Sequence, residues 1–223
     1  MSDSPPGGSG VSLILLAAGG GSRFGGEPGA KLFADFGGVP LIQATLSGMM
    51  EAPVDEMIVV VGARADEVRD VCEPLGVRGL KVVENPEWKV GMSTSVRLGI
   101  SSCASGAQAA VVALADQPLV GAGAVERLVG AFEGGAEAAV ATYGGERRNP
   151  ALFARGLWPM LIENLSGDSG ARSVLRERQD LVTEVPCDGV ADPADVDTVE
   201  DLRRLEGMMY PATGRETGER SKA

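Results

Sequence analysis

Five apolar runs separated by amphipathic segments constrain the fold of this chain more than any other feature. The runs VSLILLAA, MIVVV, LKVV, AAVVAL and AAVAT are bounded by turn residues, which is the pattern of strands buried on both faces of a parallel sheet. Between them lie four segments with helical periodicity, LIQATLSGMM, RADEVRDVC, STSVRLGI and GAVERLVGAF. This alternation predicts βαβ units in a doubly wound, mostly parallel sheet, and therefore a three-layer α/β/α fold.

The alternation loosens after Thr142. GGERRNPALF predicts a turn and a strand, GLWPMLIENL and ARSVLRERQ predict helices, LVTEVP predicts a strand, and VEDLRRLEGMM predicts a last helix. We interpret this half as inserted or antiparallel. Residues 11–209 then form one domain, large enough to bury roughly 70% of the surface that its unfolded chain would expose. Residues 1–10 and 210–223 are rich in Gly, Pro, Ser and charge, and we expect them to be disordered tails.

Composition excludes several classes of function. The chain has 20 Lys and Arg against 31 Asp and Glu, a formal charge of −11, which argues against nucleic-acid or membrane partners. No apolar run approaches the ~20 residues of a membrane span, and MSDSPPGGSG lacks the features of a signal peptide, so we expect a cytoplasmic protein. The three cysteines have no CxxC spacing, which argues against a disulfide framework or a zinc site. The complete lack of histidine removes histidine-based triads, metal clusters and general bases.

A glycine-rich stretch, LAAGGGSRFGGEPGAK, ends the first apolar run. Gly19, Gly20 and Gly21 let the backbone come close to a ligand, and Arg23 and Lys31 add cations suited to a polyphosphate. In open α/β sheets ligands bind outside the carboxyl ends of the strands, which is where this stretch lies. We interpret it as a phosphate-binding loop; the alternative is a flexible glycine-rich turn.

Two better-known phosphate loops do not match this stretch. Its glycines have the spacing GxGxxxG instead of the GxGxxG dinucleotide fingerprint, which disfavours a Rossmann dehydrogenase. GGEPGAKL also departs from a P-loop, because Ala30 and Leu32 stand where that motif has Gly and Ser or Thr.

Carboxylates follow two other predicted elements. Asp116 in LADQPLV comes directly after a buried run, where it could hold a hard cation or cap the next helix. In DVDTVEDL, Thr198 and Asp201 have the spacing of a helix start, whereas Asp195 and Asp197 exceed what capping requires.

The loop NPEWKVGM and the helix after it supply further polar groups. Asn85, Gly91 and Ser95 could donate or accept hydrogen bonds from a base or ribose, although Ser93 and Ser95 could equally cap the helix. We interpret Trp88, in the same loop, as a packing residue.

Two more stretches carry groups suited to an anion. In LSGDSGARSVL, Asp168 precedes a predicted helix and Arg172 lies in its first turn, where a helix N-terminus and a cation favour an anion. Arg147 and Arg148 could also bind an anionic acceptor, or they are ordinary surface residues.

Taken in this order, the motifs resemble those of the molybdenum cofactor nucleotidyltransferases. The resemblance covers roughly residues 11–208 and rests on LAAGGGSRFGG with Lys31, NPEWKVGMSTSVRLGI, LADQPLV, LSGDSGARSVL and DVDTVEDL. It implies a Rossmann-related fold like that of the nucleotide-diphospho-sugar transferases. The sequence departs from the family pattern in two places: GGEPGA intervenes before Lys31, and RRNP stands where relatives have Gly-His-Pro.

The resemblance assigns roles to these residues. The Gly19 to Gly21 backbone and Arg23 would hold the β and γ phosphates, and Lys31 would neutralise the α phosphate. Asp116 would bind Mg²⁺ with Asp197 as the better second ligand and Asp195 as the alternative.

The other pocket residues would serve the nucleoside and the acceptor. Asn85 and Ser95 would serve the nucleoside, and Asp168 and Arg172 the acceptor phosphate.

The resemblance also suggests substrates. LAAG, with Ala17 and Ala18, is associated in the family with cytidylyl transfer and LAGG with guanylyl transfer, so CTP is expected as the nucleotide. The implied acceptor is a molybdopterin-type cofactor, and the product would serve a molybdenum hydroxylase.

Three rival functions stay open at this point. They are a guanylyl or sugar-phosphate nucleotidyltransferase of the same fold, an NAD(P)H-dependent oxidoreductase, and a non-catalytic chaperone for cofactor insertion.

Overall fold

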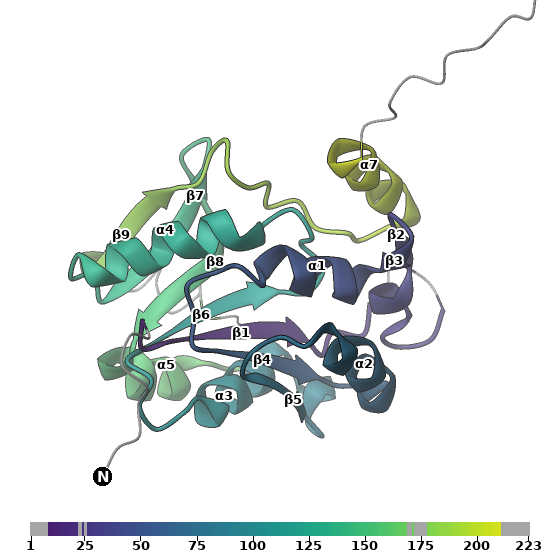
Figure 1. Cartoon of the computed structure of the whole chain (residues 1–223). Coiled ribbons are helices and arrows are strands. Elements are labelled where there is room, and N and C mark those ends of the chain that lie inside the picture. Colours follow the sequence, from purple (N-terminus) through teal and green to yellow (C-terminus); the bar gives the residue numbers. More distant parts are fainter. Residues whose placement is uncertain (1–8, 22–23, 25, 169–170, 172–177, 211–223) are drawn as a thin grey trace, which may run out of the picture.

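The fold is built around strand β1 (Val11–Ala17), whose seven residues are all buried. The computed structural model describes residues 9–21, 24, 26–168, 171 and 178–210, and in this part of the chain seven strands form a sheet of order β5-β4-β1-β6-β8-β7-β9 (Figure 1). The other strands of this sheet are β4 (Glu56–Val61), β5 (Leu80–Glu84), β6 (Ala109–Leu114), β7 (Ala138–Tyr143), β8 (Glu146–Ala154) and β9 (Val182–Pro186). β1 pairs in parallel with β4 and β6, β4 with β5, and β7 with β9, whereas β8 runs antiparallel between β6 and β7.

Helices cover both faces of the sheet (Figure 1). They are α1 (Leu41–Met49), α2 (Ala65–Cys72), α3 (Met92–Ser102), α4 (Gly121–Glu133), α5 (Trp158–Asn164) and α7 (Val199–Met209). The short elements are 3-10 helices, labelled η, and one two-stranded antiparallel ribbon. The 3-10 helices are η1 (Ala30–Phe33), η2 (Glu73–Leu75), η3 (Trp88–Val90), η4 (Arg155–Leu157) and η5 (Gln179–Leu181), and the ribbon consists of β2 (Asp35–Phe36) and β3 (Val39–Pro40).

The alternation of side chains along β1 divides the core into two layers. Leu13 and Leu15 pack toward α1, α2 and α4, whereas Ile14 and Leu16 pack toward α3 and α5. A smaller cluster, which includes the fully buried Val196, joins α7 to the β2–β3 ribbon. The predicted three-layer α/β/α fold is therefore confirmed.

The structure corrects one detail of the prediction and confirms another. LKVV forms β5, but its residues are only partly buried because β5 is an edge strand paired with β4 alone, so burial on both faces was a wrong expectation for this run. GGERRNPALF does form an antiparallel strand, β8, inserted between β6 and β7.

Most of the predicted helix ARSVLRERQ and of the two predicted tails lies outside the described residues. Within the described residues, no helix combines the length and apolar character that crossing a membrane requires.

The strand order creates a crevice at the carboxyl ends of β1 and β6. The chain moves from β1 outward to β4 and β5, and then returns to form β6 on the other side of β1. At such a switch point the connections leave in opposite directions, and ligands bind in the gap. The glycine-rich loop after β1 and Asp116 after β6 are thereby brought to the same place.

At the amino ends of the strands, opposite the crevice, one buried carboxylate connects three neighbouring strands. Glu56 of β4 is 6% exposed, and it accepts hydrogen bonds from the Ser12 hydroxyl, the Lys81 ammonium and the Ala104 backbone N–H, each at 2.6 Å. Burial alone would raise the pKa of Glu56, but these three donors together lower it below its usual value of 4.5.

We predict that Glu56→Gln lowers the free energy of unfolding by about 1 to 3 kcal/mol at neutral pH, because hydrogen bonds to a buried charge are weakened. The folded pKa lies below 4.5, so this stabilisation is complete above that pH and is lost as the pH falls through the folded pKa. Urea titrations across the acidic range should show the gap to wild type shrinking. Glu51→Gln, at an exposed position, is the control, and a gap that did not change with pH would contradict the role of the Glu56 charge.

Candidate functional site

A pocket of about 400 Å³ opens at the carboxyl ends of β1 and β6. Its wall comes from five parts of the chain: the end of β1 with the glycine loop, η1, the segment around η3 with the start of α3, the end of β6, and Asp168. The residues are Leu16, Ala17, Ala18, Gly19, Gly20, Lys31, Leu32, Trp88, Lys89, Gly91, Met92, Ser95, Leu114, Ala115, Asp116 and Asp168. Most of the residues predicted from the sequence thus surround one cavity.

The glycine loop folds back on itself and returns Lys31 to the pocket. The Gly29 N–H donates to the Gly20 carbonyl at 3.3 Å, and the Phe24 N–H donates to the Gly21 carbonyl at 3.0 Å. η1 begins directly after this closure. The Gly29–Gly20 hydrogen bond brings the residues just before η1 next to the end of the glycine run, and Lys31 lines the cavity.

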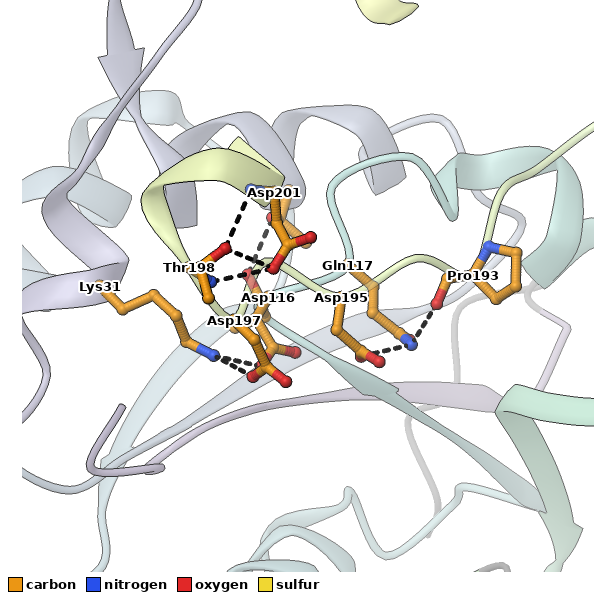
Figure 2. Close-up of polar contacts among 10 residues, drawn as sticks. Lys31, Asp116, Gln117, Pro193, Asp195, Asp197, Thr198 and Asp201 are labelled. Carbon is orange, nitrogen blue, oxygen red and sulfur yellow. Dashed lines mark hydrogen bonds and ion pairs between the residues drawn. The ribbon is translucent and has the colours of Figure 1, made fainter. Parts of the chain in front are cut away.

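Lys31 lies between two carboxylates from distant parts of the chain (Figure 2). Its Nζ is 2.6 Å from Asp116 Oδ2 and 3.8 Å from Asp197 Oδ1. The Lys31 side chain is 11% exposed, whereas those of Asp116 and Asp197 are 24% and 42% exposed. Both carboxylates therefore remain accessible to a ligand.

Three hydrogen bonds fix the backbone around Asp116. The Ala115 N–H donates to the Leu16 carbonyl at 3.0 Å, which extends the β1–β6 ladder by one step. The Thr45 hydroxyl of α1 donates to the Ala115 carbonyl at 2.9 Å, and the Val196 N–H donates to the Asp116 carbonyl at 2.9 Å. Asp116 is thus held from the sheet, from a helix and from the C-terminal segment.

Asp197 is positioned from both of its sides. Before it, Val196 is buried and bonded to Asp116. After it, Thr198 and Asp201 form a capping box that starts α7, with the Asp201 N–H donating to the Thr198 hydroxyl and the Thr198 N–H donating to Asp201 Oδ2 (Figure 2). The predicted helix-start role of Thr198 and Asp201 is confirmed.

Negative charge is concentrated around Asp195. Its carboxylate accepts a hydrogen bond from Gln117 Nε2 at 2.9 Å. Asp195 is exposed as a residue. Partial desolvation of its carboxyl group, followed by the charges of Asp116 and Asp197, nevertheless raises its pKa, and the Gln117 hydrogen bond and Lys31 offset this only in part.

The donor set suits a cation that also binds substrate oxygens. Among the described residues, no three His, Cys, Asp or Glu side chains converge into a ready-made metal centre. Mg²⁺ typically uses one or two carboxylates and completes its shell with substrate phosphates and water. Asp116 and Asp197 match that pattern, with Asp195 nearby.

The opposite wall is assembled by a glycine contact. Gly91 has φ 134°, and a Cβ there would collide with the Gly167 carbonyl and lie 2.9 Å from the Asp168 backbone nitrogen. The Ser93 N–H donates to the Gly167 carbonyl at 3.0 Å. Gly91 therefore allows the loop with Asp168 to dock on the start of α3, which brings Asp168 to the pocket.

Asn85 occupies a different place from the one predicted. It is 3% exposed and lies behind the lining, where Nδ2 donates to the hydroxyls of Thr94 and Ser95, both at 2.9 Å, and Oδ1 accepts from the Glu87 N–H. Its amide is used within the loop, so it organises the wall on which Ser95 lies.

Trp88 packs as expected and also lines the pocket. A Cβ at Gly62 would lie 2.6 Å from Trp88 Cγ, and one at Gly20 would lie 3.4 Å from the Trp88 ring, so the indole fits against two glycines. Lys89 and Met92 also line the cavity. Sequence reasoning missed all three as lining residues, although they belong to the NPEWKVGM motif that pointed to the nucleoside.

Several predicted residues do not reach this pocket or fall outside the described residues. Arg23 and Arg172 lie outside them. Arg147 pairs with Glu184 at 2.7 Å and Arg148 with Glu146 at 2.6 Å, and neither arginine is part of the pocket wall.

We predict that Trp88 reports occupancy of the pocket. In Trp158→Phe, which leaves Trp88 as the single tryptophan, a nucleoside triphosphate with Mg²⁺ should change the indole emission, because Trp88 lines the cavity. In Trp88→Phe the change should vanish, since Trp158, the first residue of α5, is buried with its N–H bonded to the Phe153 carbonyl. A change of equal size in both variants would contradict the position of the ligand.

Comparisons with known proteins agree with this geometry. The family model of the MobA-like NTP transferase domain matches residues 13–182. The chain is 33% identical over 201 residues to the nicotine blue oxidoreductase of Paenarthrobacter nicotinovorans, and the match covers 87% of this chain and 96% of that protein. Among solved structures it resembles a nucleotidyl transferase from Methanothermobacter thermautotroptrophicus (25% identity, TM-score 0.73, covering 89% of this chain and 96% of that one). It also resembles Rv0371c from Mycobacterium tuberculosis in complex with manganese (27% identity, TM-score 0.70, covering 87% and 97%). The match over most of the chain, with a relative of this identity and coverage, shows that the protein belongs to the MobA-like NTP transferase family.

Proposed function

We propose that the protein transfers CMP from CTP to a phosphorylated small molecule, a molybdopterin-type cofactor, and releases pyrophosphate. The observation that carries the proposal is the placement of Lys31 between Asp116 and Asp197, beside a glycine backbone, at the switch point of the sheet. A cation and two accessible carboxylates at the end of a nucleoside-sized pocket suit a triphosphate bound with a divalent ion.

Asp116 and Asp197 would hold the divalent ion, Mg²⁺ in this proposal. Hard carboxylate oxygens are the ligands that this ion prefers, and the relative of known structure in complex with manganese supports a divalent ion in this family. When bound, the ion would neutralise charge that develops on the transferring phosphate.

The side chains of this protein would contribute alignment and charge. The backbone of Gly19, Gly20 and Gly21, with Arg23, would hold the β and γ phosphates. Lys31, released from its pairing with Asp116 when the ion binds, would place its ammonium at the α phosphate. Electrostatic stabilisation of this kind dominates phosphoryl-type chemistry.

The reaction needs no histidine. An oxygen of the acceptor's phosphate attacks the α phosphorus, and the bond from that phosphorus to the bridging oxygen of the β phosphate breaks. A phosphate monoester has a second pKa near ~6, so the nucleophile is largely ionised at neutral pH without a protein base. Asp168 and Arg172, the latter in the first turn of the predicted helix, would hold the acceptor phosphate.

We predict Mg²⁺-dependent pyrophosphate release from CTP when molybdopterin is the acceptor. In Asp116→Asn the rate should fall by more than about 100-fold, since a direct metal ligand is lost and even outer groups around a metal contribute 10 to 100-fold. Asp70→Asn, which removes one exposed carboxylate of α2, should keep the wild-type rate. Failure of wild type to release pyrophosphate with this acceptor, or near-normal activity of Asp116→Asn at saturating Mg²⁺, would count against the proposal.

A second candidate is an oxidoreductase, favoured by the similarity to nicotine blue oxidoreductase. In that function the protein would take electrons from NAD(P)H. The GxGxxxG spacing of the first loop argues against it, because it departs from the dinucleotide fingerprint. Oxidation of NADPH with a dye acceptor, without pyrophosphate release from any triphosphate, would favour this function.

We predict that CTP is preferred over GTP. Ala17, the last residue of β1, and Ala18 after it are buried and line the pocket, and we expect the Ala18 methyl to leave less space for a purine. One such group typically alters selectivity by ~1 to 3 kcal/mol, about 10 to 200-fold. Ala18→Gly should relax the ratio of kcat/KM for CTP and GTP without reversing it. A wild-type preference for GTP would exclude cytidylyl transfer, and an unchanged ratio in the variant would show that Ala18 does not select the base.

A further inference from the structure

Gln117 joins the two segments that carry the site's carboxylates, and neither the mechanism above nor the sequence analysis uses it. It is 3% exposed, and its Nε2 donates to the Pro193 carbonyl at 2.8 Å and to Asp195 Oδ1 at 2.9 Å (Figure 2). Its Oε1 is buried, with no hydrogen-bond partner among the described residues. Burial of an unpaired amide oxygen is unfavourable, so the two donated bonds have to outweigh it.

The segment that Gln117 holds has no regular structure of its own. Residues 187–198 run from the end of β9 to the start of α7 without forming a helix or strand. Two backbone hydrogen bonds attach it to the loop after β6, from the Val196 N–H to the Asp116 carbonyl at 2.9 Å and from the Asp192 N–H to the Leu119 carbonyl at 3.1 Å. These bonds set the path of the main chain, whereas the Gln117 amide also fixes the carboxylate of Asp195.

An amide side chain is suited to holding both the Pro193 carbonyl and the Asp195 carboxylate. Both groups that it contacts are acceptors, so the side chain between them must supply two N–H donors. A carboxylate would repel Asp195, and a cation would compete with Lys31 for the charges of the site. A neutral amide satisfies both acceptors and leaves the net charge at Asp116 and Asp197 unchanged.

We propose that Gln117 is a positioning residue for the divalent ion of the proposed function, on which this inference rests. By holding Asp195 and the Pro193 carbonyl, its amide keeps Asp197 beside Asp116 and holds the Asp195 carboxylate in a fixed orientation. Loss of the amide frees Asp195 to turn and lets the segment move away from Asp116. The affinity for the ion falls, while the nucleoside pocket is retained.

The test measures metal affinity directly. Binding of Mn²⁺ in the presence of a non-hydrolysable CTP analogue is followed by electron paramagnetic resonance in wild type, Gln117→Met and Gln108→Met. The control makes the same chemical change at the other end of β6, where the exposed Gln108 donates to the Gly106 carbonyl. Outer groups around a metal typically contribute 10 to 100-fold to affinity, so Gln117→Met should bind Mn²⁺ about 10-fold more weakly, and Gln108→Met should match wild type.

Two further measurements separate positioning from a purely structural role. Pyrophosphate release by Gln117→Met should recover most of its rate at saturating Mg²⁺, and its metal-free affinity for the CTP analogue should equal that of wild type. If Gln117→Met does not fold, Gln117→Asn, which keeps the amide but withdraws it by one methylene, should show the same weakening of Mn²⁺ binding.

Equal Mn²⁺ affinity in wild type and the Gln117 variant would overturn the inference and leave the proposed function standing. A wild-type protein that binds no Mn²⁺ with the analogue would overturn both.

Discussion

Parallel pairing of β1 with β4 on one side and with β6 on the other is the constraint on which the rest of the structure depends. Every residue of β1 is buried, so its side chains are committed to the two core layers and its backbone to the two ladders. The connection to β4 passes through α1 on one face, and the connection into β6 passes through α3 on the other face. The carboxyl ends of β1 and β6 are therefore adjacent and uncovered, and the groups that follow them meet there.

The carboxylates beside Lys31 affect which form of a nucleotide can bind in the pocket. Lys31 is shared between Asp116 and Asp197, and the pKa of Asp195 is raised first by partial desolvation and then by the charges of these two carboxylates. A free triphosphate would be repelled by these carboxylates, whereas a triphosphate that carries a divalent ion would be attracted. In a chain of net charge −11, we infer that the metal complex of the nucleotide binds more tightly than the free nucleotide.

The sequence was sufficient for the sheet and for the loops that follow β1 and β6, because long apolar runs and turn residues are local signals. It failed at the edge strand β5, since burial depends on how many neighbours a strand has and local composition does not report that. The approach of Asp197 to Lys31 was beyond local reasoning as well. It depends on an irregular segment held by Val196 and Gln117, contacts that join residues more than 70 positions apart. Trp88 packs against Gly20 and Gly62 as predicted, but the fact that the same ring also lines the pocket is visible only in three dimensions.

Two carboxylates, Glu56 at the start of β4 and Asp195 beside the loop after β6, show how the same interactions affect both stability and chemistry. At Glu56, burial is outweighed by the Ala104 N–H, Lys81 and Ser12, so the pKa falls and the charged group stabilises the fold. At Asp195, desolvation and then the charges of Asp116 and Asp197 outweigh the Gln117 hydrogen bond and the more distant Lys31, so the pKa rises. Placing three carboxylates together costs stability, and the ladders of β1 and the capped start of α7 hold them in place despite the repulsion. A bound cation would offset this repulsion, so we expect the crowding of the carboxylates to favour binding of the ion.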